Sequence, residues 1–216
     1  MSAEDFTWTP DPAIVAESNL VAFMKRHGID DYDALMARAE ADPDWYWNAV
    51  LEENDYRFYK PYDRVLDTSK GAAWAEWCVG GTTNTVLNCL DKWRDTPTYA
   101  REAISWEGED GSRRVLSYAE LDAETCRLAG GLRALGLGRG DVVGVYMPML
   151  PEAVAAFLAI IKIGGIALPL FSGFAAEAAA TRMNDGGAKG LILADGSLRR
   201  GQPIDMKAVA DEVAAA

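Results

Sequence analysis

Few residues of this 216-residue sequence have the types and spacing that chemistry at a metal ion or a nucleophile requires. The one histidine, His27, cannot form a His-based metal cluster, and its isolation disfavours a Ser-His-Asp triad. The cysteines are odd in number, form no CxxC pair and are interpreted as reduced thiols of a cytosolic protein: Cys78, Cys89 and Cys126. The sequence therefore predicts no metal site and a cytoplasmic location, and it leaves open a site built on cysteine or carboxylate.

Three other groups of residues resemble functional sites but have a structural explanation. The stretch Gly80-Gly81-Thr82-Thr83 looks like a phosphate-binding loop, yet it lacks the glycine and lysine that follow in such loops, so we predict no phosphate cradle there. Asp91 and Glu152 are predicted to be a helix cap and a helix-dipole partner rather than catalytic carboxylates. The cluster Trp45-Tyr46-Trp47 is predicted to be a packing patch rather than a ligand cage.

Composition and charge exclude several classes of partner. Half of the residues are apolar and a quarter are charged, as in ordinary soluble domains. The net charge of -12 argues against a nucleic-acid backbone or an anionic membrane as the main partner. The longest apolar stretch, residues 153–170, is interrupted by Lys162 and a glycine pair, and the acidic N-terminus lacks a signal-peptide core. We therefore expect neither a membrane nor a nucleic-acid partner.

The element around which the sequence is organised lies at residues 140–170. The run Val142–Tyr146 is β-branched and uncharged, which predicts a strand buried on both faces. Pro148 and Pro151 mark a turn, a helix follows, and Gly164-Gly165 ends it before a second apolar run at 166–170. Strand, crossover helix and strand form a βαβ unit, so the sequence predicts a parallel sheet.

Further elements are expected on both sides of this unit. Ser117 and Glu120 form a capping box that opens a helix to about residue 135. The other expected elements are strands at 99–106, 113–116 and 190–194, an alanine-rich helix to about 184 and a helical tail at 206–215. In the N-terminal part we expect one helix over residues 11–26, two more before residue 55, a strand near 64–66 and a helix at 85–93. Phe6 and Trp8 could pack against other parts of the chain.

These patterns predict an α/β fold in which a helical N-terminal segment precedes a partial parallel βαβ sheet flanked by helices. We divide it into residues 1–95, a helical and loop-rich segment, and residues 96–216, a first α/β subdomain. No internal repeat is visible.

The sequence resembles the short-chain acyl-CoA synthetases of the AMP-forming, adenylate-forming superfamily, particularly the acetyl-CoA synthetase type. The resemblance is continuous over about residues 60–210, while residues 1–55 fit the family's N-terminal segment only loosely. The residues that carry it are 74–77, Gly80-Gly81, Asn84, 88–91, 116–121, Gly140-Asp141, 145–152, 163–165, 171–174, Glu177 and Arg182. The combination of YMPMLPE with IGG and FSGF at the expected distances is specific to the family.

The resemblance implies a two-step ligation in which a carboxylate and ATP give an acyl-adenylate and coenzyme A then displaces AMP. Full-length members use ATP, Mg²⁺ and coenzyme A. In the family the phosphate loop, the nucleotide-binding motifs and the catalytic lysine follow the region matched here, and they are missing before Ala216. We therefore expect an incomplete adenylate-forming N-domain, a fragment inactive alone, with no catalytic residue assigned. The alternative is a truncated paralogue that binds coenzyme A or another protein.

The resemblance carries over one binding segment, the FGGF-type loop that contacts the nucleotide part of coenzyme A. Phe171 and Gly173 match this loop, and Ser172 replaces a glycine. Core packing remains open as the role of Phe171, and Gly173 could simply permit a turn.

The family also places an arginine pair near the coenzyme A nucleotide. Arg199 matches the first arginine, Gln202 stands where the second would be, and Arg200 lies beside Arg199. A guanidinium can donate two hydrogen bonds to phosphate oxygens, which suits a phosphate of coenzyme A. The alternative for Arg199 and Arg200 is that they are solvent-exposed basic residues beyond the end of a strand. Arg182 is predicted to form a structural ion pair. The expected partners are a small carboxylate and coenzyme A, with self-association through an exposed sheet edge.

Overall fold

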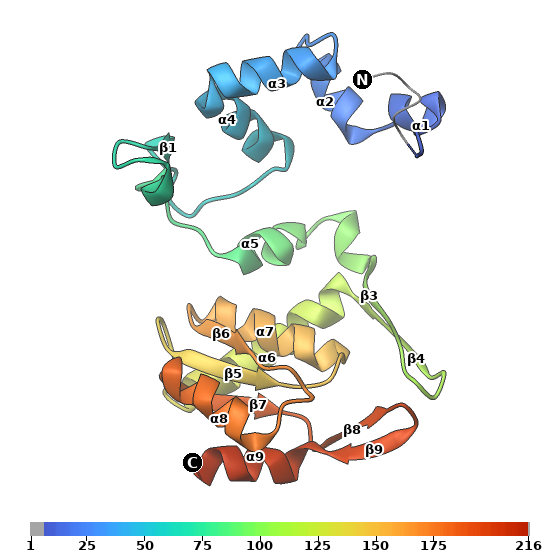
Figure 1. Cartoon of the computed structure of the whole chain (residues 1–216), viewed down its shortest axis with the longest axis vertical. Coiled ribbons are helices and arrows are strands. Elements are labelled where there is room, and N and C mark those ends of the chain that lie inside the picture. The colour runs from blue at the N-terminus through green and yellow to red at the C-terminus, as the bar shows by residue number, and fades with distance from the viewer. Residues whose placement is uncertain (1–6, 216) are drawn as a thin grey trace. The chain divides into compact units, whose positions relative to one another are not determined.

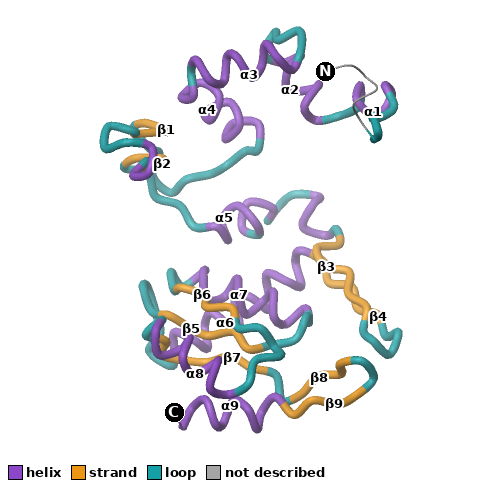
Figure 2. The backbone as a smooth tube through the Cα atoms, viewed as in Figure 1, coloured by secondary structure: helices purple, strands orange, loops and turns teal. Residues whose placement is uncertain are grey.

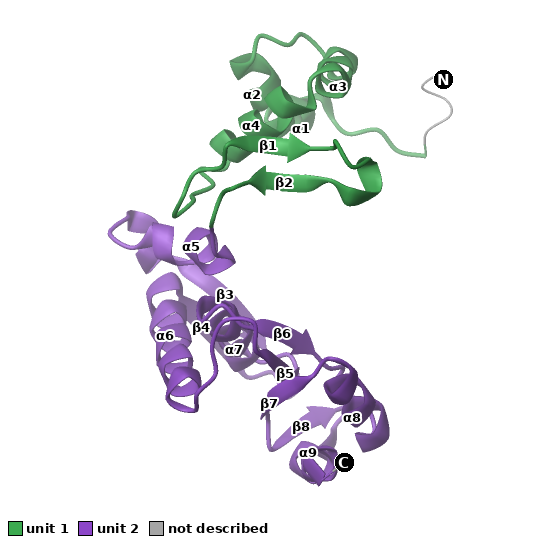
Figure 3. Cartoon of the chain, turned by 90° about the vertical axis from the view of Figure 1, so that its left-hand side faces the viewer, with its two compact units in different colours: residues 1–82 green, residues 83–216 purple. Residues whose placement is uncertain are grey.

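The computed structural model describes residues 7–215, and these divide between residues 82 and 83 into two compact units (Figure 3). Phe6 lies outside the described residues, and Trp8 is exposed. The predicted division at residues 95 and 96 stays a prediction. Figures 1 and 2 show the order of helices and strands along the chain.

The first unit is mainly helical, and short polar side chains begin its helices. Its helices are α1 (Pro12–Ala16), α2 (Asn19–Arg26), α3 (Tyr32–Ala41) and α4 (Pro43–Glu53). The single helix expected over residues 11–26 is wrong. Ser18 has extended backbone angles and accepts a hydrogen bond from the amide of Val21, so a second helix starts there. Asp31 and Asp42 cap α3 and α4 in the same way.

A small core and a two-stranded sheet complete the first unit. Its buried residues are Phe23, Met24, Leu35 and Ala49, and Trp45 and Tyr46 pack against them. This contact confirms the packing role predicted for the aromatic cluster. Strand β1 (Arg64–Asp67) confirms the strand expected near residues 64–66, and it pairs antiparallel with β2 (Glu76–Val79), a strand that the sequence did not predict.

The second unit contains the parallel sheet that the sequence predicts. Strand β5 (Val142–Tyr146) lies between β6 (Ile166–Pro169) and β7 (Ala188–Leu193) and is parallel to both. Two helices, α6 (Tyr118–Ala134) and α7 (Pro151–Lys162), bury a cluster with Val143 and Val145 on one face. Two others, α8 (Ala176–Asp185) and α9 (Met206–Ala215), cover the face of Tyr146 (Figure 1). The predicted α/β fold class is therefore confirmed.

Two hairpins and a set of short helices surround this sheet. The hairpins are β3 (Glu102–Glu107) with β4 (Arg113–Ser117), and β8 (Gly196–Arg199) with β9 (Gln202–Asp205). The strand expected from residue 99 begins only at Glu102, because Pro97 opens a 3₁₀ helix, η4 (Pro97–Ala100). The helix expected over residues 85–93 breaks at Leu90, giving α5 (Thr85–Cys89) and η3 (Asp91–Trp93). No described helix has the length and apolar character needed to cross a membrane.

Ion pairs around one buried carboxylate, that of Asp122, tie the short helices to α6 and α7. The Asp122 side chain is 4% exposed and accepts hydrogen bonds from Arg94 at 2.6 and 2.7 Å and from the Tyr99 hydroxyl at 2.8 Å. Lys162 lies 2.7 Å from Asp91 and 3.7 Å from Asp122. Burial alone would raise the pKa of the Asp122 carboxyl, but hydrogen bonds from Arg94, Tyr99 and Cys126 outweigh it and lower the pKa to about 2. The network fixes the segment that precedes the sheet.

Asp122→Asn is expected to lower the free energy of unfolding by about 2 kcal/mol at neutral pH. The pKa of the Asp122 carboxyl is about 2 in the folded chain and has the ordinary value of 3.8 in the unfolded chain, so the ionised carboxylate stabilises the fold. The pKa is depressed in the folded chain. The stabilisation is therefore complete above the ordinary pKa and is lost as the pH falls from about 4 to about 2. Urea titrations at several pH values, followed by far-UV circular dichroism, measure this difference.

The matched control is Glu124→Gln on the same helix, whose pair with Arg127 is exposed, and it should change the free energy by less than about 0.5 kcal/mol. A difference between wild type and Asp122→Asn that stays constant down to the acid limit would contradict the role given to Asp122.

Candidate functional site

The predicted binding residues lie at the carboxyl ends of the parallel strands. Residues 171–174 follow β6 and connect it to α8, and the β8–β9 hairpin follows β7. In open α/β sheets this edge is where ligands bind. The parallel topology thus brings Phe171 and Gly173 to the same edge as Arg199, although 26 residues separate Gly173 from Arg199 in the sequence.

The loop of residues 171–174 is a tight turn with an exposed aromatic ring. The amide of Phe174 donates to the carbonyl of Phe171 at 2.9 Å, and the two rings meet edge to face with centroids 5.6 Å apart. Phe171 is 57% exposed, so the alternative that it is a core residue is wrong. Its ring is available to a ligand.

Gly173 brings the loop and the β8–β9 hairpin into close approach. A Cβ atom at this position would lie 2.7 Å from Cε1 of Phe171 and 2.8 Å from Nη1 of Arg199. The Arg199 guanidinium carbon lies 5.6 Å from the centre of the Phe171 ring. Gly173 has no positive φ, and a side chain at this position would displace the Phe171 ring and the Arg199 guanidinium from their contact. Phe171, Gly173 and Arg199 form one contact group.

Arg199 has hydrogen-bond donors available for an anion. Within the described residues no carboxylate lies within 4.0 Å of its guanidinium nitrogens. The next residue, Arg200, has φ +54°, and Gly201 has φ +72°, as the two central positions of a tight hairpin turn require. A phosphate beside Arg199 would thus meet an exposed guanidinium at a rigid hairpin end.

The tip of the β3–β4 hairpin holds the tip of the β8–β9 hairpin. The Glu109 carboxylate accepts hydrogen bonds from the amides of Arg200 and Gly201 at 3.2 and 3.1 Å. Sequence reasoning missed Glu109, because nothing in the turn GEDGS indicates a partner 91 residues away. The turn Arg200-Gly201 is flanked by polar residues and lacks the asparagine or aspartate typical of two-residue hairpin turns, so the sequence carries only a weak signal for the second hairpin.

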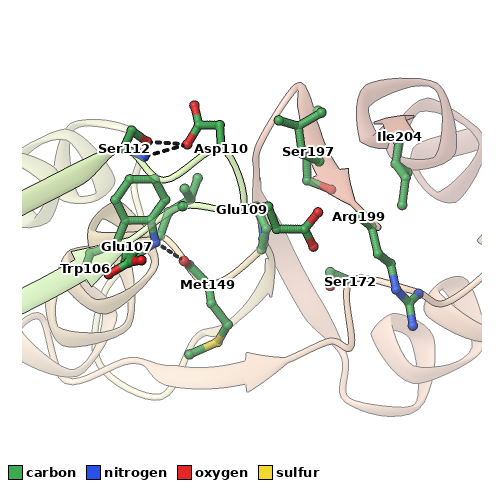
Figure 4. Close-up of a pocket in the computed structure, with 15 residues that line it drawn as sticks. Trp106, Glu107, Glu109, Asp110, Ser112, Met149, Ser172, Ser197, Arg199 and Ile204 are labelled. Atoms are coloured by element: carbon green, nitrogen blue, oxygen red, sulfur yellow. Dashed lines mark hydrogen bonds between the residues drawn. The ribbon is translucent and has the colours of Figure 1, made fainter. Parts of the chain in front are cut away.

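A cavity of about 420 Å³ lies between the two hairpins (Figure 4). Its lining combines apolar and polar side chains, among them Trp106, Met149, Ser172, Leu198, Arg199 and Ile204. Trp106 donates from Nε1 to the carbonyl of Met149 at 2.6 Å, which fixes the indole against the turn that follows β5. The carboxylates of Glu107, Glu109 and Asp110 also line the cavity, and that of Glu109 points toward the hairpin that carries Arg199 (Figure 4). The cavity therefore offers a ligand the indole of Trp106 and the guanidinium of Arg199 beside three carboxylates.

Comparison with known proteins identifies the family. Residues 91–215 match the family model of AMP-binding enzymes, and residues 32–89 match that of the acetyl-coenzyme A synthetase N-terminus. The chain belongs to the AMP-binding enzyme family. The resemblance noted in the sequence is therefore confirmed.

Individual relatives of this AMP-binding enzyme chain agree with that assignment. The acetyl-coenzyme A synthetase of Chlorobaculum tepidum is 42% identical over 188 residues, covering 85% of this chain and 27% of the relative. The acetyl-coenzyme A synthetase of Thiobacillus denitrificans is 39% identical over 212 residues, which cover 98% of this chain and 31% of the relative. The structure of acetoacetyl-CoA synthetase from Streptomyces lividans superposes with a TM-score of 0.86 at 30% sequence identity. The superposition covers 95% of this chain and 32% of the synthetase chain. The chain thus spans less than a third of the length of these relatives.

The remaining candidate residues have structural partners. In the Gly80–Thr83 stretch, the amides of Gly81 and Thr82 donate to the carbonyls of Cys78 and Lys60, which argues against a phosphate cradle. The described residues contain no group of three or more His, Cys, Asp or Glu side chains arranged to hold a metal ion.

Three predicted roles concern charged residues. Asp91 is an ion-pair partner of Lys162 and Arg94 and makes no capping hydrogen bond, so its predicted cap role is wrong. Glu152 lies in the first turn of α7, as predicted, and accepts a hydrogen bond from Arg114 at 2.6 Å, which lowers the pKa of its carboxyl. The ion pair predicted for Arg182 is wrong: its guanidinium lies 4.2 Å from the Phe174 ring centre and donates to the carbonyl of Ala178.

Proposed function

We propose that this chain supplies the coenzyme A-contacting part of an AMP-forming acyl-CoA synthetase. The overall reaction joins a small carboxylate to coenzyme A and converts ATP to AMP and pyrophosphate, with Mg²⁺ bound to the nucleotide. In this proposal Arg199 donates to a phosphate of coenzyme A, and the exposed Phe171 ring packs against the nucleotide. Arg200 lies at the same hairpin tip and adds positive charge. The protein is proposed to act in the cytoplasm.

The observation that carries the proposal is the contact group of Phe171, Gly173 and Arg199. An exposed ring, a glycine in contact with that ring and an arginine without a carboxylate partner among the described residues meet at the carboxyl edge of a parallel sheet. Core packing does not explain an exposed phenylalanine, and charge pairing does not explain this arginine. The 3′-phosphate of coenzyme A suits such an arginine because a guanidinium donates two parallel hydrogen bonds to phosphate oxygens.

Arg199→Ala is expected to weaken binding of coenzyme A at least about tenfold, because a charge-assisted hydrogen bond to phosphate contributes about 1.5–3 kcal/mol. Isothermal titration of wild type and variant with coenzyme A and with dephospho-coenzyme A measures the effect. Binding of dephospho-coenzyme A should change little, since it lacks the 3′-phosphate.

The control for that titration is Arg133→Ala, an exposed arginine on α6 away from the hairpin, which should leave both affinities unchanged. Wild-type affinity for coenzyme A in Arg199→Ala would remove Arg199 from the site.

The 216 residues alone are proposed to catalyse no ligation, because none of them is assigned to hold the triphosphate of ATP. Incubation with ATP, Mg²⁺, short carboxylates and coenzyme A is expected to release no pyrophosphate above the rate without protein. A coupled pyrophosphate assay measures this rate, and sustained turnover would contradict the proposal.

A stand-alone module, which would bind coenzyme A or another protein, is the second candidate, and the open edges of its sheet count against it. Within the described part of the chain, β6 and β7 each pair only with β5, so each presents backbone groups to a further strand. We expect self-association through one of these edges, seen as a concentration-dependent increase in mass by analytical ultracentrifugation. A monomer at all concentrations would contradict this expectation. The length of the native gene product distinguishes a module from part of a longer synthetase.

A further inference from the structure

The hydroxyl of Tyr146 connects the buried core to the loop of residues 171–174. Tyr146 ends the central strand β5, and its side chain is 2% exposed in the cluster with Leu170, Ala179 and Met206. The hydroxyl oxygen lies 3.0 Å from the carbonyl oxygen of Phe174 and 3.3 Å from that of Ser172. A phenol has one proton, so the hydroxyl donates to both carbonyls in a shared hydrogen bond.

The two carbonyls lie on either side of Gly173. The hydroxyl therefore restrains the peptide units of Ser172 and Phe174, and through them the backbone angles of the glycine between them. At Gly173 the loop lies close to the Arg199 guanidinium, because a Cβ atom there would be 2.8 Å from its Nη1. The position of this backbone therefore bears on the contact between the loop and Arg199.

The phenol of Tyr146 is a suitable hydrogen-bond donor for restraining the loop of residues 171–174. Burial raises the pKa of the Tyr146 phenol, so the proton stays in place at neutral pH. Phenylalanine would fill the same core volume without donating to the loop. A purely apolar core needs no hydroxyl at this position, and the loop carbonyls that it satisfies belong to a partly exposed segment.

We propose that Tyr146 is a positioning residue whose hydroxyl holds the loop of residues 171–174 in the conformation that presents Phe171 and Arg199 to the nucleotide part of coenzyme A. The proposal rests on the proposed function. Tyr146 does not touch the ligand and acts through the two carbonyls and Gly173.

The test compares Tyr146→Phe with wild type by isothermal titration with coenzyme A and by hydrogen exchange of the peptide that contains residues 171–174. We expect affinity for coenzyme A to fall about fivefold, the effect of one hydrogen bond. Affinity for dephospho-coenzyme A should fall by a similar factor, since the whole loop is displaced. Exchange in the loop peptide should rise while exchange in β5 and β7 stays the same.

The matched control is Tyr62→Phe, which removes a hydroxyl that donates to Asn48 at 2.6 Å in the other compact unit. It should change neither affinity nor loop exchange. Incorporation of p-aminophenylalanine at position 146 restores N–H donors at the same place and should recover both the affinity and the loop protection. A merely structural role would lower the unfolding midpoint and raise exchange throughout the sheet instead.

The outcomes separate the two proposals. If wild type does not bind coenzyme A, the proposed function fails, and the loop exchange of Tyr146→Phe still tests the positioning role. Wild-type affinity together with unchanged loop exchange in Tyr146→Phe would overturn the role given to Tyr146. If Tyr146→Phe does not fold, the variant with p-aminophenylalanine at position 146 is tested in its place. Rapid exchange of the loop amides in that folded variant would also overturn the positioning role of Tyr146.

Discussion

Parallel pairing of β5 with both β6 and β7 is the constraint on which the site depends. Parallel strands place their carboxyl ends at one edge, and each crossover must return through a helix that covers a face of the sheet. The loop after β6 and the hairpin after β7 therefore meet beside the end of β5. Residues far apart in the sequence, such as Phe171 and Arg199, become neighbours without any direct attraction being required to bring them together.

The site combines a rigid base with exposed ligand-facing groups. Tyr146 is buried at the end of β5, whereas Phe171 and Arg199 are exposed at the same edge. Glu109 holds the second hairpin through two amides, so both segments that carry the exposed groups are tied by hydrogen bonds to other elements. Preorganisation of this kind reduces the entropy lost when a ligand binds.

The predictions from the sequence failed where a capping side chain, an atypical turn or a tertiary contact outweighed the local pattern. The break at Ser18 follows from a capping side chain that competes with a continuous helix. The β8–β9 hairpin was missed because its strands are short and its turn, Arg200-Gly201, requires positive φ at a residue that is not glycine. Arg182 was expected to pair with an acid, but it lies over the Phe174 ring, and a contact between a helix and a loop before it leaves no local pattern.

The sequence by itself determined the βαβ order, the capping box at Ser117 and the family, because these depend on local periodicity and on motifs read in order. The tertiary structure alone decided that Phe171 is exposed, that Gly173 lies against the Arg199 guanidinium, and that Tyr146 and Glu109 hold the segments on which Phe171 and Arg199 lie. Those facts depend on distances between residues that are 26 to 92 positions apart. Such distances are fixed by the packing of strands and helices, and no short stretch of sequence encodes them.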